Sequence, residues 1–267
     1  MRILAMLTNP LTAGSVLAAA SCLAARSGSA EIDLLYPRPD IDPDFMPTED
    51  VYTEAQRRGF EAAQDQLVKQ LSQEAANWSG AGLPGLRQMR GQPAAIAGDA
   101  AAGANFVILG APHGDFEADT ILDTLLFKAN TPVLLVPRTM PRSFGQRIAI
   151  AWQAECAAAE RAVGALDGLL LGAKRTTILI GDQGASSSSP PAALLHRLSE
   201  AGKPAVVHHF PLDGRHIGEA LLSEARQAKA DLLVMGAFSH GRLREFIFGG
   251  ATIEILRDFD LPVLMHH

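Results

Sequence analysis

The chain has 267 residues, of which 48% are hydrophobic and 19% are charged, and its formal net charge is −6. This composition is typical of a globular protein, and no apolar run is long enough to predict a membrane span. The acidic balance argues against a nucleic-acid partner, because phosphate backbones require a basic surface. The two cysteines, Cys22 and Cys156, lack a metal-ligand spacing, so we interpret them as small buried thiols in a reducing cytoplasm.

The N-terminal segment allows two interpretations. Arg2, the apolar run 11–25 and the small residues at 19–22 imitate a signal peptide. The alternative is a strand over residues 2–7 followed by an alanine-rich buried helix. We favour the second interpretation, because residues 147–151 repeat the opening strand inside the chain, where no export signal could act.

Short apolar runs alternate with segments of helical period along the whole chain. In the first half the predicted strands are 2–7, 31–36, 106–109 and 133–136, with a long helix over 49–77 capped by Thr48 and a further strand not placed within 85–97. In the second half the predicted strands are 147–152, 176–180, 205–210, 232–235 and 263–265, and the predicted helices are 155–171, 191–201, 217–229 and 251–259. This alternation predicts right-handed βαβ crossovers and a mostly parallel sheet covered on both faces.

Part of the pattern occurs twice. Residues 104–111 (ANFVILGA) match residues 230–237 (ADLLVMGA) at an offset of 126, whereas residues 131–135 match 261–265 at an offset of 130. The second copy therefore carries four more residues between the two matching stretches. Loops in this position are where parallel α/β folds bind ligands, so the copies are expected to differ in binding rather than in core structure.

The repeat predicts an α/β protein of two tandem doubly wound parallel-sheet domains. The first domain covers residues 1–138, the second covers residues 147–267, and the segment 137–146 is the linker. Edge strands of such sheets can pair, so a homodimer of the whole chain is a further expectation.

The loop after the predicted strand 232–235 has the character of an anion site. Gly236 permits a tight turn, and Gly249 and Gly250 open the last predicted helix. Glycines there let backbone N–H groups approach an anion at the positive end of the helix dipole, and the hydroxyl of Thr252 adds a donor. The alternative is that these glycines only turn the chain.

The spacing Gly236-x-x-Ser239, nine residues, then Gly249-Gly250 resembles the G-x-x-G-x(9)-G-[S/T] signature of the universal stress protein family. The resemblance covers both halves in strand order, so the chain looks like a tandem universal stress protein. The resemblance implies a five-stranded parallel sheet of the adenine nucleotide alpha hydrolase-like type in each half, with the halves packed as an internal pseudo-dimer. It also implies a stress-response regulatory role, and ATP, ADP or AMP bound at this loop in some members.

The sequence departs from that signature in ways that bear on the ligand. Ser239 replaces the second motif glycine, Gly250 replaces the Ser or Thr, and Gln153 and Thr8 stand where ATP-binding members have an Asp. We therefore expect a partly retained site for an adenine nucleotide or another anion in the second domain. Its predicted residues are Gln153, Gly236, Ser239, Gly241, Gly249, Gly250 and Thr252. In the first domain the loop 110–131 has four acidic residues and no paired glycines, so no cofactor is expected there.

Catalytic and metal sites are weaker interpretations. Ser239 lies in a stretch that imitates the nucleophile elbow of serine hydrolases, but the acids and histidines that follow fall within one predicted helix and one strand. His208 and His209 are adjacent on a predicted strand, so they point to opposite faces and cannot readily chelate one ion. We expect no catalytic residue and no metal; a zinc site built from distant histidines such as His113 and His216 stays open, but it has no spacing to support it.

The sequence leaves three functions open. The favoured one is a binding and regulatory module. The second is a slow nucleotide hydrolase or phosphotransferase at the same pocket, which the missing carboxylates for Mg²⁺ disfavour. The third is a structural partner protein that binds no nucleotide.

Overall fold

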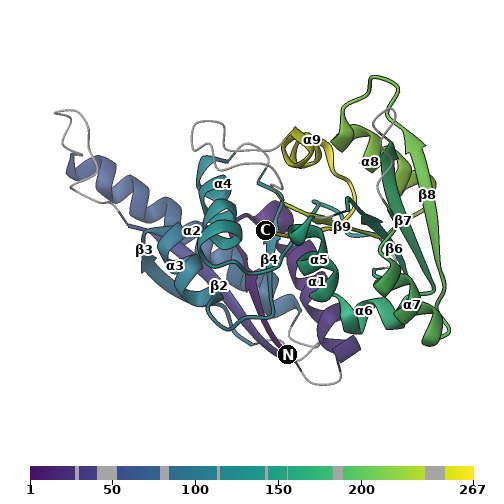
Figure 1. The fold of residues 1–267 in the computed structure, drawn as a ribbon. Helices are drawn as coiled ribbons and strands as arrows, with labels where there is room; N and C mark the ends of the chain where they lie inside the picture. The colour runs from purple at the N-terminus through teal and green to yellow at the C-terminus, as the bar shows by residue number, and fades with distance from the viewer. Residues whose placement is uncertain are drawn as a thin grey trace.

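The computed structural model describes residues 1–27, 30–40, 53–78, 84–112, 115–141, 144–154, 156–182, 189–237 and 250–267. These residues form one ten-stranded sheet that carries helices on both faces (Figure 1). The chain forms this sheet from two halves of the same topology.

The first half supplies the strands β1 (Arg2–Met6), β2 (Glu31–Pro39), β3 (Arg87–Gly91), β4 (Phe106–Gly110) and β5 (Val133–Val136). Its helices are α1 (Pro10–Ser27), α2 (Glu54–Asn77), α3 (Pro93–Ala101) and α4 (Phe116–Asp123), which continues into the π-helical turn η2 (Thr124–Lys128).

The second half supplies the strands β6 (Arg147–Ala151), β7 (Arg175–Asp182), β8 (Ala205–Pro211), β9 (Leu232–Gly236) and β10 (Val263–His266). Its helices are α5 (Ala157–Gly164), α6 (Asp167–Gly172), α7 (Ala192–Glu200), α8 (Ile217–Gln227) and α9 (Gly250–Asp258).

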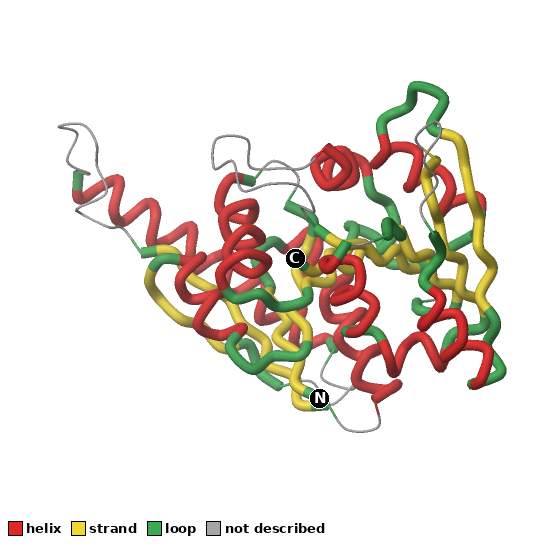
Figure 2. Tube along the Cα trace, viewed as in Figure 1, coloured by secondary structure: helices red, strands yellow, loops and turns green. Residues whose placement is uncertain are grey.

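The strand order is β3-β2-β1-β4-β5-β10-β9-β6-β7-β8, so the second half repeats the order of the first in reverse across the centre. All pairs within a half are parallel, and β5 and β10 join the halves as an antiparallel pair. β3 and β8 lie at opposite ends of the sheet (Figure 1), and helices flank the strands in both halves (Figure 2). The predicted tandem α/β fold and internal pseudo-dimer are therefore confirmed, and the two predicted sheets are joined into one.

The core divides into two layers because successive strand residues point to opposite faces. Ile3 and Ala5 belong to one buried cluster, whereas Leu4 and Met6 belong to the other. In the first layer α1 and α2 pack with α5, α6 and α7; in the second, α3 and α4 pack with α8 and α9. Corresponding helices of the two halves thus cover the same face, and each layer of the core is continuous across the junction.

The backbone hydrogen bonds repeat along with the topology. Ala111 N donates to Val136 O over 2.9 Å, and Ala237 N donates to His266 O over 2.8 Å. The residue that follows the fourth strand of each half is therefore bonded in the same way to the end of the fifth strand. This pair of bonds identifies Val136 and His266 as equivalent positions.

Two helix predictions need correction. The long helix begins at Glu54, and Thr53 caps it by accepting from Gln56 N while the Gln56 side chain accepts from Thr53 N. The predicted cap at Thr48 was wrong for this helix, and Thr48 itself lies outside the described residues. The predicted helix over 155–171 is two helices, α5 and α6, which are separated at residues 165–166.

The cysteines and the linker differ in detail from the sequence prediction. Cys22 and Cys156 are free thiols, but both are half-buried rather than buried. The linker 137–146 packs closely in its described part: Phe144 is 6% exposed, and Arg26 at the end of α1 donates to the carbonyl oxygens of Phe144 and Gly145. The two halves are therefore tied by packing and hydrogen bonds as well as by the β5–β10 pair.

Candidate functional site

The strand order of the second half reverses between β6 and β9. From β6 the chain proceeds outward to β7 and β8, and then returns to place β9 on the other side of β6. A crevice at the carboxyl ends of such strands is where open parallel α/β sheets bind ligands. Gln153 follows β6 and Gly236 ends β9, so these two predicted residues lie at this edge.

Gly236 has a packing role that the sequence did not reveal. A Cβ built on it would lie 2.6 Å from the backbone N of Ala159 and 2.8 Å from the carbonyl C of Ala158, both in the first turn of α5. Gly110, its counterpart, has the same role, since a Cβ there would lie 2.1 Å from Thr12 Oγ1 in the first turn of α1. Both glycines therefore let the first helix of each half approach the end of the fourth strand.

This close approach places the N-terminus of α5 at the edge where the strand order reverses. Cys156 is the N-cap residue and its side chain makes no capping hydrogen bond. The first backbone N–H groups of a helix have no partner within the helix, and they carry the positive end of its dipole. The start of α5 thus adds a positive potential beside Gly236.

The start of α9 is fixed by a contact with α8. Glu254 Oε2 accepts from Gly218 N over 2.7 Å, and the other oxygen lies 3.2 Å from Nδ1 of His216. A Cβ on Gly218 would lie 2.6 Å from Ala251 O, so the two helices touch through their backbones. Thr252 in this first turn is 2% exposed, so its hydroxyl is not open to solvent.

Of the remaining predicted residues, two are described and three are not. Gln153 is exposed at the end of β6, next to Trp152, whose indole Nε1 donates to Ser189 O over 3.1 Å. Gly250 is the first residue of α9. Ser239, Gly241 and Gly249 lie outside the described residues. The structure thus brings Gln153 and Gly236 to one edge and adds the beginning of α9.

Sequence reasoning missed a carboxylate at the same edge. Asp182 ends β7, the strand next to β6, and its Oδ1 lies 3.3 Å from Nδ1 of His209 on β8. The register pairs Ala151 with Leu179, so Asp182 extends past the end of β6 in the direction of the ligand edge. The signal was available, because an acidic residue directly after an apolar strand is a candidate for that edge.

The equivalent region of the first half has the opposite electrostatic character. Asp115 caps α4, and its Oδ1 accepts from Glu117 N over 3.0 Å. Burial, and then the Asp115 carboxylate, raise the pKa of Glu117 and of Asp119. Burial, followed by the nearby Asp119, raises the pKa of Asp123 to about 6. A helix start already occupied by its own carboxylate and surrounded by further acids disfavours a phosphate.

Metal ligation finds no support in the described ranges. Those residues contain no group of three or more His, Cys, Asp or Glu side chains that could hold an ion. His208 is bonded to Glu224 of α8 and His209 to Asp182, so the two rings engage different partners. In the part of the chain that the structure describes, no helix is long and apolar enough to cross a bilayer.

The fold defines a tandem α/β protein of two equivalent halves. The model of the universal stress protein family matches residues 150–267. The second half of the chain is therefore similar to the universal stress protein family, and the whole chain shares the fold of a solved universal stress protein.

Three known proteins illustrate the similarity. A universal stress protein from Archaeoglobus fulgidus DSM 4304 has a TM-score of 0.71 at 14% identity, with 99% of this chain and 95% of that chain covered. Universal stress protein Slr1230 from Synechocystis sp. (strain ATCC 27184 / PCC 6803 / Kazusa) is 39% identical over 49 residues, which span 18% of this chain and only 17% of that protein. A universal stress protein solved in complex with cAMP covers 47% of this chain, at 19% identity and a TM-score of 0.36, with 98% of its own chain covered.

Proposed function

We propose that the chain is a stress-response binding and regulatory module whose second half binds an adenine nucleotide or another anion. The observation that carries this proposal is the joint position of Gly236 and the N-terminus of α5 at the carboxyl edge where the strand order reverses between β6 and β9. A helix start and a close backbone approach are the features by which such edges hold phosphate groups.

The exposed Gln153 and the carboxylate of Asp182 extend the proposed site beyond the phosphates. Gln153 offers an amide rather than a carboxylate at the end of β6, so it can donate to and accept from hydroxyl groups. Asp182 supplies a nearby carboxylate acceptor, which suits the hydroxyl groups of a ribose. In this proposal Gln153 and Asp182 together take the role of the single Asp that the family resemblance implies at position 153.

Binding without catalysis is the form of the proposal that we favour. A nucleotide hydrolase requires carboxylates that hold Mg²⁺ and a group that orients the attacking water. The end of β6 carries Gln153 in the position from which a carboxylate would act, and Asp182 already contacts His209. We place the protein in the cytoplasm, because Cys22 and Cys156 are free thiols and a reducing compartment keeps them so. A homodimer through an outer edge strand, β3 or β8, remains part of the proposal.

Calorimetric titration with ATP, ADP and AMP tests the proposal. The wild-type chain should bind at least one of them saturably, and Gly249→Val should abolish binding because a branched side chain blocks the approach of a phosphate to the backbone. Gly168→Val is the matched control, since a Cβ on Gly168 would meet no atom within 4 Å and this residue lies on α6. Absence of heat with all three nucleotides would favour the structural partner protein instead.

A further inference from the structure

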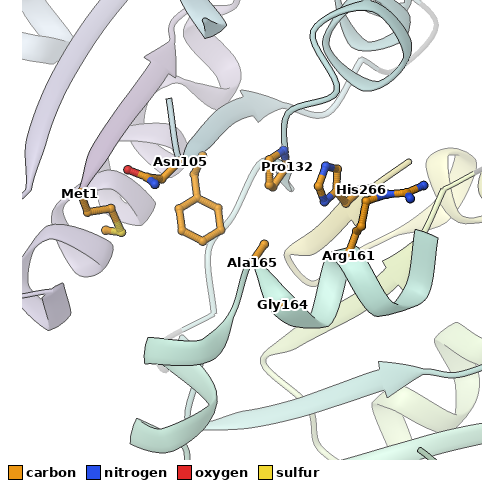
Figure 3. A pocket seen from close by; sticks show the side chains of 8 residues that line it. Met1, Asn105, Pro132, Arg161, Gly164, Ala165 and His266 are labelled. Atoms are coloured by element: carbon orange, nitrogen blue, oxygen red, sulfur yellow. The ribbon is translucent and has the colours of Figure 1, made fainter. Parts of the chain in front are cut away.

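A pocket lies between the two halves, and it is separate from the edge proposed for nucleotides. Its volume is about 490 Å³, within the usual size range of small-molecule sites. The first half contributes Met1, Asn105, Phe106 and Pro132, and the second half contributes Arg161, Gly164, Ala165 and His266 (Figure 3). The first-half wall is formed where β1 and β4 begin, whereas ligand edges of parallel sheets lie where strands end.

The internal pseudo-symmetry relates this pocket to a place on the other side of the junction. Backbone hydrogen bonds identify Val136 as the counterpart of His266 and Gln146 as the counterpart of Met1. These two residues bound the linker, of which residues 137–141 and 144–146 are described. The linker therefore begins and ends at the counterparts of two residues that line the pocket.

The described linker residues include a buried aromatic ring and backbone carbonyl groups that accept hydrogen bonds. Phe144 is 6% exposed and belongs to the core layer that contains α1 and α6. Arg26 donates to Phe144 O, Gly145 O and Leu169 O over 3.0 to 3.2 Å. This end of the linker therefore combines a phenyl group with carbonyl oxygens that accept from a guanidinium.

The lining of the pocket suits a ligand that combines an aromatic ring with oxygen acceptors. Phe106, Pro132 and Ala165 line the pocket and supply apolar surface (Figure 3). The ionisable side chains of the lining are Arg161 and His266, so none of them is acidic. Arg161 is held by its Nε, which donates to His267 O over 2.6 Å, and its guanidinium extends beyond His266 at the outer side of the pocket.

We propose that this junction pocket binds a small aromatic carboxylate. The ring occupies the apolar centre beside Phe106, and the carboxylate lies toward Arg161 and His266, in the way that the linker combines the Phe144 ring with oxygen atoms that accept from Arg26. An anion is favoured because the lining contains the guanidinium of Arg161 and no acidic side chain, and a guanidinium is the group best suited to a carboxylate. This proposal is independent of the nucleotide proposal, and the test of one does not decide the other.

Phenylacetate is the probe, and ligand-detected NMR with calorimetry on the full chain is the measurement. Saturable binding to the wild-type chain is expected, with phenylacetamide binding about tenfold more weakly because it lacks the charge. Gly164→Phe should weaken phenylacetate binding about tenfold or more, since a Cβ on Gly164 meets no atom within 4 Å and the new ring fills the pocket without a backbone clash.

Gly168→Phe is the matched control, because its Cβ also meets no atom within 4 Å and it does not line the pocket. This variant should bind phenylacetate as the wild-type chain does. The proposal is overturned if phenylacetate does not bind saturably, if Gly164→Phe binds it unchanged, or if the amide binds as well as the acid.

Discussion

Asn105 and Asp231 occupy equivalent positions in the two halves and make the same contact with the start of the central strand. Asn105 Oδ1 accepts from Arg2 N over 2.7 Å, and Asp231 Oδ1 accepts from Arg147 N over 3.0 Å. Each residue also donates its own N–H to the carbonyl oxygen of that arginine over 2.8 Å. Asn105 thus links β4 to β1, and Asp231 links β9 to β6 through the same pattern of hydrogen bonds, although one side chain is an amide and the other a carboxylate.

This relationship predicts unequal costs when each side chain is removed. Asp231 is 2% exposed and accepts from Gln146 N as well, whereas the Asn105 side chain is exposed. Asp231→Ala leaves two backbone donors unpaired and should lower the free energy of unfolding by about 2 to 4 kcal/mol, with Asn105→Ala costing about 1 kcal/mol. Urea denaturation of both variants provides the measurement, and equal losses would contradict the account.

Lys229 adopts a left-handed backbone conformation with φ of 53°, where its counterpart Gly103 has φ of 75°. A side chain in this region costs about 1 kcal/mol or more relative to glycine. Lys229→Gly should therefore raise the free energy of unfolding by about 1 kcal/mol, and Gly103→Ala should lower it by a similar amount. Thermal and urea unfolding of the two variants would reveal the opposite signs, and a loss of stability in Lys229→Gly would count against the backbone argument.

Asp123 should make stability depend on pH in the acidic range. Its pKa is raised from 3.8 to about 6, by burial and then by Asp119, and its Oδ1 has no hydrogen-bond partner among the described residues. An acid whose pKa is higher in the folded state binds its proton more tightly there, so its contribution to stability is present below about pH 4 and is lost as the pH rises through about 6. Asp123→Asn should be more stable than the wild-type chain near pH 7 and gain little near pH 4, as denaturation midpoints at both pH values would show. A stability difference that is the same at both values would rule out this origin.

Gly236→Ala tests the packing of α5 on β9. The new Cβ would meet backbone atoms of Ala158 and Ala159 that cannot move as a flexible side chain does, so we expect a loss of about 1 to 3 kcal/mol. Because the shift moves the start of α5, affinity for the nucleotide should fall as well. Gly14→Ala is the control, since a Cβ there meets no atom within 4 Å and alanine favours the interior of α1. Unchanged stability in Gly236→Ala would show that the close approach does not constrain the fold.

The tandem topology could be predicted from the sequence because strands alternate with helices in both halves and one strand-and-turn pattern is repeated. The edge strand β3 could not be placed, since its residues RQMRG are mostly exposed and lack an apolar alternation. The cap of α2 was mispredicted although the signal was present: Thr53 with Gln56 forms a capping box, and Thr48 has no such partner three residues later.

The candidate site was only partly predictable for a physical reason. Gln153 and Gly236 follow strands, and a residue after a parallel strand lies at the ligand edge wherever the neighbouring strand ends. Asp182 was missed because the strand beside β6 was predicted to end at residue 180, whereas β7 continues to Asp182. The junction pocket joins Met1, Asn105, Arg161 and His266, residues that only the pairing of β5 with β10 brings together.

A crystal structure grown with saturating ATP tests the central claim most directly. We predict one nucleotide per chain, with its phosphates beside Gly236 and the start of α5 and its ribose toward Gln153 and Asp182. Nucleotide density at the acidic start of α4, or a second half left free of nucleotide under these conditions, would contradict the account.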